Sequence, residues 1–175
     1  SENFENVLKT LKKLIDSGKI RQVGLSNENP WGVMKFLGLS KKQLTKMITI
    51  QNPYSLLNRL FEVGNAEICM RENTGLLAYS PLGFGVLSGK YLKGNLPEDS
   101  RLKLFPNLKR FSGEKSMRAT QLYMEIASKN NLSLTQMSLA FVNSQPFVTS
   151  NIIGASKLSQ LKENIESIKI NLTQE

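Results

Sequence analysis

Four short apolar segments alternate with helical patterns along this chain, and this alternation constrains the fold more than any other feature. The segments expected to be strands cover residues 20–25, 47–50, 76–80 and 147–153. A helical pattern precedes the first strand, and helical patterns follow every strand. This alternation is typical of a parallel sheet, because a parallel strand needs a long crossover before the chain can return. The sequence therefore predicts an α/β fold in a single domain, 1–175, with four parallel βα units preceded by a helix.

Several helical patterns have recognisable ends. Asn29 and Pro30 are suited to cap and open a short helix. A further helix is expected over residues 61–72, and Ser133 and Gln136 fit a capping box that opens another. The last helix is expected to bury one apolar face, which consists of Leu158, Leu161, Ile165 and Ile168.

Each predicted strand ends in small or polar residues. These are Ser26-Asn27, Gln51-Asn52, Tyr79-Ser80 and 154–156. In (β/α) barrels the active site lies at the carboxyl ends of the strands, so this placement favours a functional site over chance polarity. A closed barrel of this type needs eight strands. Because four are predicted, the chain is expected to form half of a TIM-type (β/α)8 barrel.

The third predicted strand runs directly into a glycine-rich stretch. Pro81 ends the strand because it has no N–H to give to a neighbouring strand, and glycines 83, 85 and 89 allow sharp turns. Bare backbone N–H groups beside Lys90 would suit a phosphate-bearing ligand. The alternative is a surface loop that needs glycine only for its turns, and the residue types alone leave both open. The spacing matches neither the dinucleotide fingerprint nor a P-loop.

The composition excludes several kinds of active site. The chain has no histidine and one cysteine, so it has no histidine-based triad or general acid, and no metal site is predicted. Cys69 is interpreted as a small buried hydrophobe rather than a nucleophile. The single cysteine favours a cytoplasmic location, and neither a membrane-length apolar run nor a signal-peptide pattern is present.

The charge is strongly positive. The formal net charge is +9, and residues 90–118 hold eight lysines and arginines against three acidic residues. This excess could belong to a solvated basic loop, a nucleic-acid surface or a site for a phosphate-bearing cofactor. Aromatic residues suited to stacking bases are sparse and no recognition motif is present, so the solvated loop is favoured over a nucleic-acid partner.

Five motifs in this chain resemble those of the aldo-keto reductases, in the same order. They are GKIR at 18–21, GLSN at 24–27, QNPY at 51–54, AYSPLG at 78–83, and GAS at 154–156 with QLKEN at 160–164. The segment 87–147 most closely resembles the bacterial Tas-type reductases, and the potassium-channel β subunits more distantly. The resemblance covers nearly the whole chain but only the second half of the family's (β/α)8 barrel. It implies the carboxyl-terminal half of an NADP(H)-dependent carbonyl reductase, which acts by hydride transfer.

The resemblance also implies which residues bind the cofactor. Ser26, Asn27 and Gln51 match residues that hydrogen-bond the nicotinamide carboxamide, and Tyr79 matches the aromatic residue on which the nicotinamide ring stacks. The residues that match the stretch around the pyrophosphate are Ser80, Pro81, Leu82, Gly83, Phe84, Gly85 and Leu87. The residues that match the flap and the adenosine side of the site are Lys90, Arg101, Gly154, Ser156, Gln160, Glu163 and Asn164.

The sequence departs from the family at two of these positions. Many aldo-keto reductases carry lysine and arginine where this chain has Gly154 and Gln160. A preference for NADP over NAD would then depend on Ser156, Arg101 and Lys157.

The family's catalytic aspartate, tyrosine, lysine and histidine match no residue of this chain, and Tyr54, Tyr91 and Tyr123 do not fit the tyrosine's motif. No catalytic residue is therefore predicted. The expected partner is the missing amino-terminal half of the barrel or a second copy of this chain. The complete enzyme would act on a small carbonyl substrate, without nucleic-acid or membrane partners. The alternatives are a non-catalytic nucleotide-binding or regulatory module and, ranked last, a basic nucleic-acid-binding domain.

Overall fold

The computed structural model describes residues 2–41, 44–108 and 110–173, and the chain divides into two compact units. The first unit consists of Ser1–Asn52, Leu60–Leu77 and Pro146–Ser150. The second unit consists of Pro53–Arg59, Ala78–Gln145 and Asn151–Glu175. The single domain expected over residues 1–175 stays a prediction.

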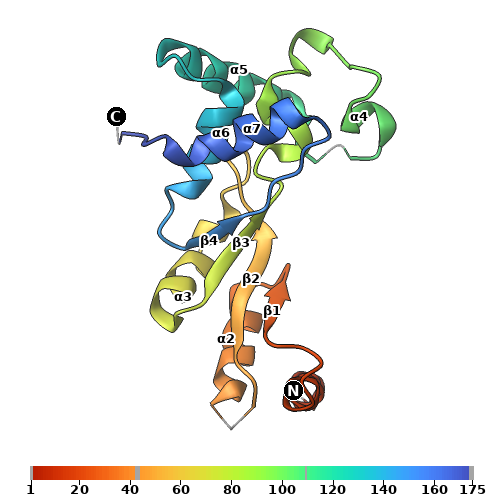
Figure 1. The fold of residues 1–175 in the computed structure, drawn as a ribbon, viewed down its shortest axis with the longest axis vertical. Helices are drawn as coiled ribbons and strands as arrows, with labels where there is room; N and C mark the ends of the chain where they lie inside the picture. Colours follow the sequence, from red (N-terminus) through yellow and green to blue (C-terminus); the bar gives the residue numbers. More distant parts are fainter. Residues whose placement is uncertain (1, 42–43, 109, 174–175) are drawn as a thin grey trace. The chain divides into compact units, whose positions relative to one another are not determined.

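Four parallel strands form one sheet in the order β1-β2-β3-β4 (Figure 1). They are β1 (Val23–Ser26), β2 (Met47–Pro53), β3 (Gly75–Tyr79) and β4 (Val148–Asn151). β1 pairs with β2 in parallel, and the Leu76 N–H donates to the carbonyl of Phe147 beside β4 at 2.9 Å. The strands alternate with helices, as in a partial (β/α) barrel. The predicted α/β class with four parallel strands is therefore confirmed.

The first unit holds three helices, α1 (Glu2–Asp16), α2 (Pro30–Ser40) and α3 (Asn65–Glu72), of which α2 packs against both others. Asn29 caps α2 as predicted, since its Oδ1 accepts a hydrogen bond from the Gly32 N–H at 2.9 Å. The buried apolar side chains of this unit include Leu25, Val33, Leu37, Met47, Ile50 and Leu76.

Several predicted boundaries differ in this unit; β2, for example, extends to Pro53 instead of ending at residue 50. The helix expected over 61–72 is two elements, η1 (Leu60–Glu62) and α3. Gly64 separates them because its φ of 102° cannot continue a right-handed helix. The first strand begins at Val23 rather than at residue 20, and its pairing with β2 is irregular directly after Val23.

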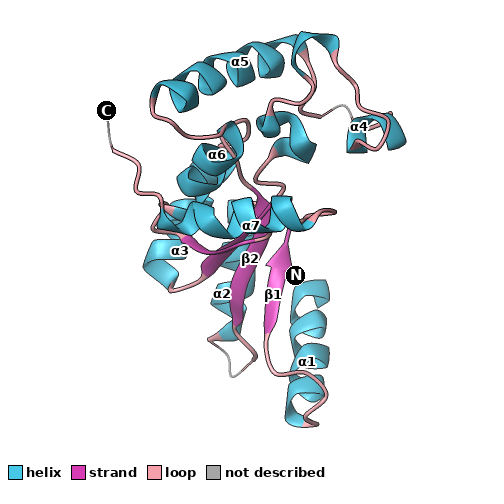
Figure 2. Ribbon diagram, turned by 45° about the horizontal axis from the view of Figure 1, so that its top comes forward, coloured by secondary structure: helices cyan, strands magenta, loops and turns pink. Residues whose placement is uncertain are grey.

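The second unit is largely helical (Figure 2). Its longer helices are α5 (Glu114–Lys129), α6 (Leu134–Asn143) and α7 (Leu158–Glu166), and α6 packs against both α5 and α7. The basic segment follows η2 (Gly83–Ser88); its described residues before α5 form the short elements η3 (Leu92–Gly94) and α4 (Arg101–Leu104). A further short element, η4 (Ser167–Lys169), follows α7.

One helix end was predicted correctly and one helix face was not. Ser133 caps α6 in the predicted capping box, since its Oγ accepts from the Gln136 N–H at 3.0 Å and the Gln136 Oε1 accepts from the Ser133 N–H at 3.0 Å. The expected burial of Leu158, Leu161, Ile165 and Ile168 is wrong, because all four are exposed. The residues that α7 and η4 bury are Asn164 and Ser167, on a different face.

Candidate cofactor site

The loop after β3 is built from left-handed backbone conformations. Ser80, Gly83, Phe84, Gly85 and Gly89 have φ values of 53°, 53°, 59°, 91° and 77°. Glycine adopts such values without a steric penalty, whereas Ser80 and Phe84 must be held there by their surroundings. The N–H groups of the three glycines each donate to the carbonyl three residues earlier, at 2.9 to 3.0 Å. These three N–H groups close turns of the loop and are not free for a ligand.

Gly85 leaves room for the side chain of Lys90. A Cβ at position 85 would lie 3.1 Å from Lys90 Cε and 3.4 Å from its Nζ. The ammonium group also lies 5.2 Å from the ring centroid of Tyr91, a cation–π distance. Tyr91 is buried in an apolar cluster, and its hydroxyl oxygen accepts a hydrogen bond from the Leu102 N–H at 3.4 Å. The buried ring thus links Lys90 to the start of α4, which carries Arg101.

A cavity of about 930 Å³ opens beside this loop, within the second unit. The cofactor residues predicted from the sequence that line it are Tyr79, Ser80, Pro81, Leu82, Phe84, Gly85, Lys90, Arg101, Gly154, Ser156, Gln160, Glu163 and Asn164. Gly83 and Leu87 do not line it, because both are buried beneath the loop. Asp99 and Ser133 line it without having been predicted. The sequence features that could have indicated them are the place of Asp99, an acidic residue inside a basic segment, and the capping box that begins at Ser133.

The segment after β4 forms another part of the cavity wall. The Gln160 Oε1 accepts hydrogen bonds from the N–H groups of Ser156 (3.0 Å) and Lys157 (3.3 Å), and from the Ser156 Oγ (3.3 Å). Asn164 donates from Nδ2 to the Gly154 carbonyl at 3.5 Å. Side-chain amides therefore hold this segment against the first turns of α7.

The carboxylates around the cavity interact with neighbouring side chains, whereas two of the cations have no ion-pair partner among the described residues. The Asp99 carboxylate lies 3.4 Å from Lys157 Nζ, and the Glu163 carboxylate accepts a hydrogen bond from the Ser133 Oγ at 2.5 Å. Neither Lys90 nor Arg101 has an ion-pair partner among the residues that the structure describes. The two cations are thus available to an anionic ligand.

The other three predicted cofactor residues lie in the first unit, at the carboxyl ends of β1 and β2. Ser26 is the register partner of Gln51, and the Asn27 N–H donates to the Gln51 carbonyl at 3.0 Å. The loop after β1 is held by Asn52 and Asn65, whose Nδ2 atoms each donate to the Glu28 carbonyl at 3.2 Å. Sequence reasoning missed both asparagines as supports of this loop.

Among the described residues that line the cavity, the groups able to donate or accept a proton in catalysis are its carboxylates, its cations and the Tyr79 phenol. Tyr54 is buried and stacks on Phe141, and the Tyr123 hydroxyl donates to the Leu56 carbonyl at 3.4 Å. Burial raises the pKa of the Cys69 thiol to about 11, so at neutral pH it is protonated and unreactive. No cluster of potential metal ligands occurs among the described residues.

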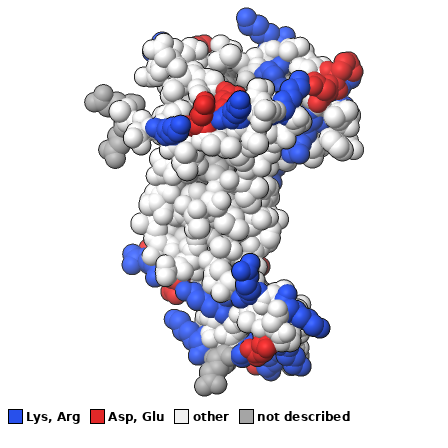
Figure 3. Space-filling model, in the orientation of Figure 1, with Lys and Arg blue, Asp and Glu red and all other residues white. Residues whose placement is uncertain are grey.

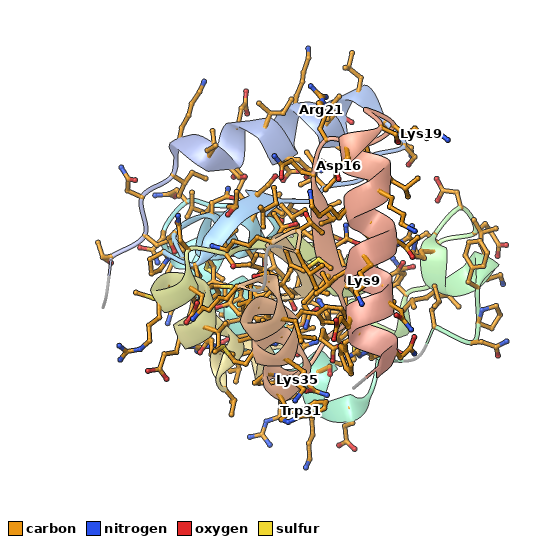
Figure 4. The ribbon with its side chains drawn as sticks, turned by 90° about the horizontal axis from the view of Figure 1, so that it is seen from below. Lys9, Asp16, Lys19, Arg21, Trp31 and Lys35 are labelled. Carbon is orange, nitrogen blue, oxygen red and sulfur yellow. The ribbon has the colours of Figure 1, made fainter. Side chains whose placement is uncertain are left out.

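Cations and carboxylates are mixed on α7, and the cations of the first unit are spread along it. Lysine and glutamate alternate over α7 in the space-filling view (Figure 3). On the first unit, Trp31 is exposed and Lys35 Nζ lies 5.8 Å from its ring, but Lys19 and Arg21 lie at the opposite end of α1 (Figure 4). Lys9 is paired with Glu5 at 3.0 Å. These cations therefore do not converge on an aromatic platform.

No helix in the described part of the chain is long and apolar enough to span a membrane.

The sequence matches known proteins along its whole length. The sequence model of the aldo/keto reductase family matches residues 1–175. The Tas protein of Escherichia coli K12 is 49% identical over 174 residues, which cover 97% of this chain and 50% of Tas. The L-glyceraldehyde 3-phosphate reductase of the same organism is 33% identical over 97% of this chain and 50% of its own length.

A protein of Oryza sativa subsp. japonica named "Probable voltage-gated potassium channel subunit beta" is 32% identical over 80% of this chain and 47% of its own length. The chain thus spans about half the length of the curated relatives it matches. These matches confirm the resemblance inferred from the sequence motifs. The chain belongs to the aldo/keto reductase family.

Proposed function

We propose that this chain provides the cofactor-binding half of an NADP(H)-dependent carbonyl reductase. The observation that carries the proposal is the cavity of the second unit, where Tyr79, the glycine loop, Lys90 and Arg101 meet. The reaction class is taken from the family. Of the two relatives of Escherichia coli named above, one is the Tas protein and the other is a reductase whose name gives an aldehyde as its substrate.

The residues of the cavity fit a dinucleotide that carries phosphate groups. Its volume of about 930 Å³ lies within the usual range of ligand pockets, roughly 300–1,000 Å³. Lys90 and Arg101 offer cations without competing ion pairs, and charge-assisted hydrogen bonds to phosphate are among the stronger ones. The missing Cβ at Gly85 leaves room for the Lys90 side chain to lie against the loop backbone. The Ser156 hydroxyl and Arg101 are the proposed basis for preferring NADP to NAD.

When bound, the reduced nicotinamide supplies a hydride to the carbonyl carbon of the substrate. Tyr79 offers an aromatic face for stacking, which fixes the face of the nicotinamide that is presented. Ser26, Asn27 and Gln51 offer both donors and acceptors to a carboxamide. The carbonyl oxygen also needs a proton, and we propose that the donor belongs to the part of the barrel outside this chain. A complete reductase of this kind would reduce a small aldehyde or ketone in the cytoplasm.

The test is a titration of the chain with NADPH, followed by fluorescence quenching. Lys90→Ala should weaken binding by about 1.5–3 kcal/mol, because a hydrogen bond from a charged donor is lost. Lys103→Ala is the matched control, since Lys103 pairs with Glu98 at 3.2 Å and does not line the cavity. Absence of saturable NADPH binding, or equal affinity in the Lys90 and Lys103 variants, would contradict the proposal. Weaker binding of NADH than of NADPH would support the NADP preference.

A non-catalytic nucleotide-binding module is the second candidate, favoured by the match to the potassium-channel β subunit. Both candidates bind NADPH, so turnover distinguishes them. We expect no NADPH consumption with a reactive aldehyde above a no-protein control from this chain alone, because general acid catalysis worth about 10²–10⁴-fold is missing. Turnover by a complex with the rest of a barrel favours the reductase, and its absence from such a complex favours the module.

A further inference from the structure

The hydroxyl group of Ser133 connects the start of α6 to a carboxylate on α7. Its Oγ accepts a hydrogen bond from the Gln136 N–H at 3.0 Å and donates one to the Glu163 Oε1 at 2.5 Å. An ionised carboxylate accepts hydrogen bonds and cannot donate them, so the hydroxyl hydrogen of Ser133 lies on the Glu163 side. The bond is therefore charge-assisted, a class that is shorter and stronger than neutral hydrogen bonds.

Glu163 depends on this hydrogen bond for its orientation. Its side chain is half-buried and lines the cavity of the second unit. No lysine or arginine pairs with it among the residues that the structure describes. A glutamate side chain has several rotatable bonds, and fixing them costs conformational entropy. The hydroxyl group on α6 thus supplies the contact that holds this carboxylate in one place.

The carboxylate of Glu163 keeps one oxygen for a ligand. Oε1 accepts from Ser133, whereas Oε2 has no hydrogen-bond partner within the described part of the chain. Because a carboxylate only accepts, its partner on the ligand must be a donor such as an amino group. The negative charge would repel a phosphate group. The part of the cavity beside Glu163 therefore suits an uncharged, amine-bearing end of a ligand, in contrast to the part beside Lys90 and Arg101.

The group at C6 of a purine base decides whether it fits such a carboxylate. Adenine carries a 6-amino group that donates, whereas guanine and hypoxanthine carry a 6-oxygen that accepts. A 6-oxygen facing Glu163 would leave two acceptors opposed to each other without a hydrogen bond. A carboxylate that is fixed in place therefore selects the 6-amino base, and one that is free to turn away selects less.

We propose that Ser133 is a positioning residue, whose hydroxyl group fixes the Glu163 carboxylate so that the cavity selects a 6-amino purine over a 6-oxo purine. The inference rests on the proposed function, which assigns a dinucleotide to this cavity. Ser133 then has two roles with different chemical requirements. Capping α6 needs only an acceptor for the Gln136 N–H, whereas positioning Glu163 needs the hydroxyl hydrogen.

Three substitutions at Ser133 separate these two roles. Ser133→Asp keeps the cap, since aspartate caps helices about as well as serine, but it has no hydrogen to give to Glu163 and adds a second carboxylate beside it. Ser133→Gly removes the hydroxyl group without adding a charge, and glycine in place of serine costs a helix cap little stability. Ser133→Thr keeps the hydroxyl group and is the matched control.

The test compares dissociation constants, measured by fluorescence quenching, for NADPH and for its analogue with hypoxanthine in place of adenine. The unsubstituted chain and Ser133→Thr should bind NADPH about tenfold more tightly than the analogue, because one hydrogen bond to a charged group is lost with the analogue. In Ser133→Asp and Ser133→Gly the two constants should differ by less than about twofold, because the carboxylate is no longer held. The melting temperature of these two variants should fall by no more than about 4 °C, since the cap is kept.

The possible outcomes distinguish this inference from the proposed function. Absence of saturable NADPH binding by the unsubstituted chain would contradict the proposed function and overturn the inference with it. Saturable but equal binding of the two cofactors, or a preference for NADPH that survives in Ser133→Asp and Ser133→Gly, would leave the function standing and overturn the role of Ser133. Loss of all binding by these two variants would also overturn it, because Ser133 would then support the whole site rather than one carboxylate.

Discussion

Two segments of the second unit line the same cavity but are held in place by different means. The segment 80–91 owes its shape to left-handed backbone turns and to Tyr91, which is buried in an apolar cluster. The segment 154–164 is held by polar side chains, chiefly the amide of Gln160, and most of its residues are exposed. The contrast indicates that the first segment is part of the folding core, whereas the second is attached to it and can change with little effect on stability.

This difference has a consequence for the ligand. In the first segment the groups that place Lys90 are also groups that stabilise the fold, because Gly85 and Tyr91 both contact its side chain. In the second segment Ser156 is placed by hydrogen bonds near the surface. Substitutions in 80–91 should therefore change stability and cofactor affinity together. Substitutions in 154–164 should change affinity or cofactor preference with a smaller loss of stability.

The largest expected effect comes from Tyr91→Ala. Removing a buried aromatic ring should lower the free energy of unfolding by about 3–5 kcal/mol, measured by urea denaturation. That is a large part of the stability of a typical domain, about 5–15 kcal/mol. Tyr91→Phe is the control, because it keeps the ring and loses only the 3.4 Å hydrogen bond with Leu102. A loss below about 1 kcal/mol for Tyr91→Ala would show that the first segment is not part of the core.

The next prediction compares how alanine substitutions of one glycine from each segment change the free energy of unfolding. Gly85→Ala introduces a side chain at a φ of 91° and 3.1 Å from Lys90 Cε, so it should cost about 1–2 kcal/mol in the free energy of unfolding and weaken NADPH binding. Gly154 has no such φ, and a Cβ there would meet nothing within 4 Å. Gly154→Ala should stay within about 0.5 kcal/mol of the unsubstituted chain. Equal losses for the two variants would remove the distinction between the segments.

Much of the fold could be predicted from the sequence, because the local sequence patterns agreed with the tertiary structure. The alternation of strands and helices predicted the parallel sheet, and the caps at Asn29 and Ser133 formed as their chemistry requires. Thirteen of the predicted cofactor residues line one cavity, because the segments that carry most of them follow the neighbouring strands β3 and β4.

The remaining features depend on contacts that a sequence pattern does not specify. The spacing of Leu158, Leu161, Ile165 and Ile168 correctly groups them on one face, but whether a neighbour covers that face depends on the rest of the fold. The glycines likewise predict turns, but they do not show which backbone N–H groups make the hydrogen bonds that close those turns. Hence the turns at these glycines were predicted correctly, while the hydrogen bonds made by their N–H groups were not predicted.

The smallest expected effect separates the structural role of Gln160 from any contact with a ligand. Gln160→Ala removes the oxygen that accepts from the N–H groups of Ser156 and Lys157, and it should lower the free energy of unfolding by about 0.5–1.5 kcal/mol. Gln160→Glu replaces the amide oxygen by a carboxylate oxygen that can accept the same hydrogen bonds, and a negative charge in the first turn of α7 is favourable, so stability should not fall. The same charge should repel a phosphate group, so NADPH affinity should fall in Gln160→Glu by more than its stability does. If both variants instead lose stability equally, the amide oxygen does not hold the segment, and the contrast between the two walls of the cavity needs another cause.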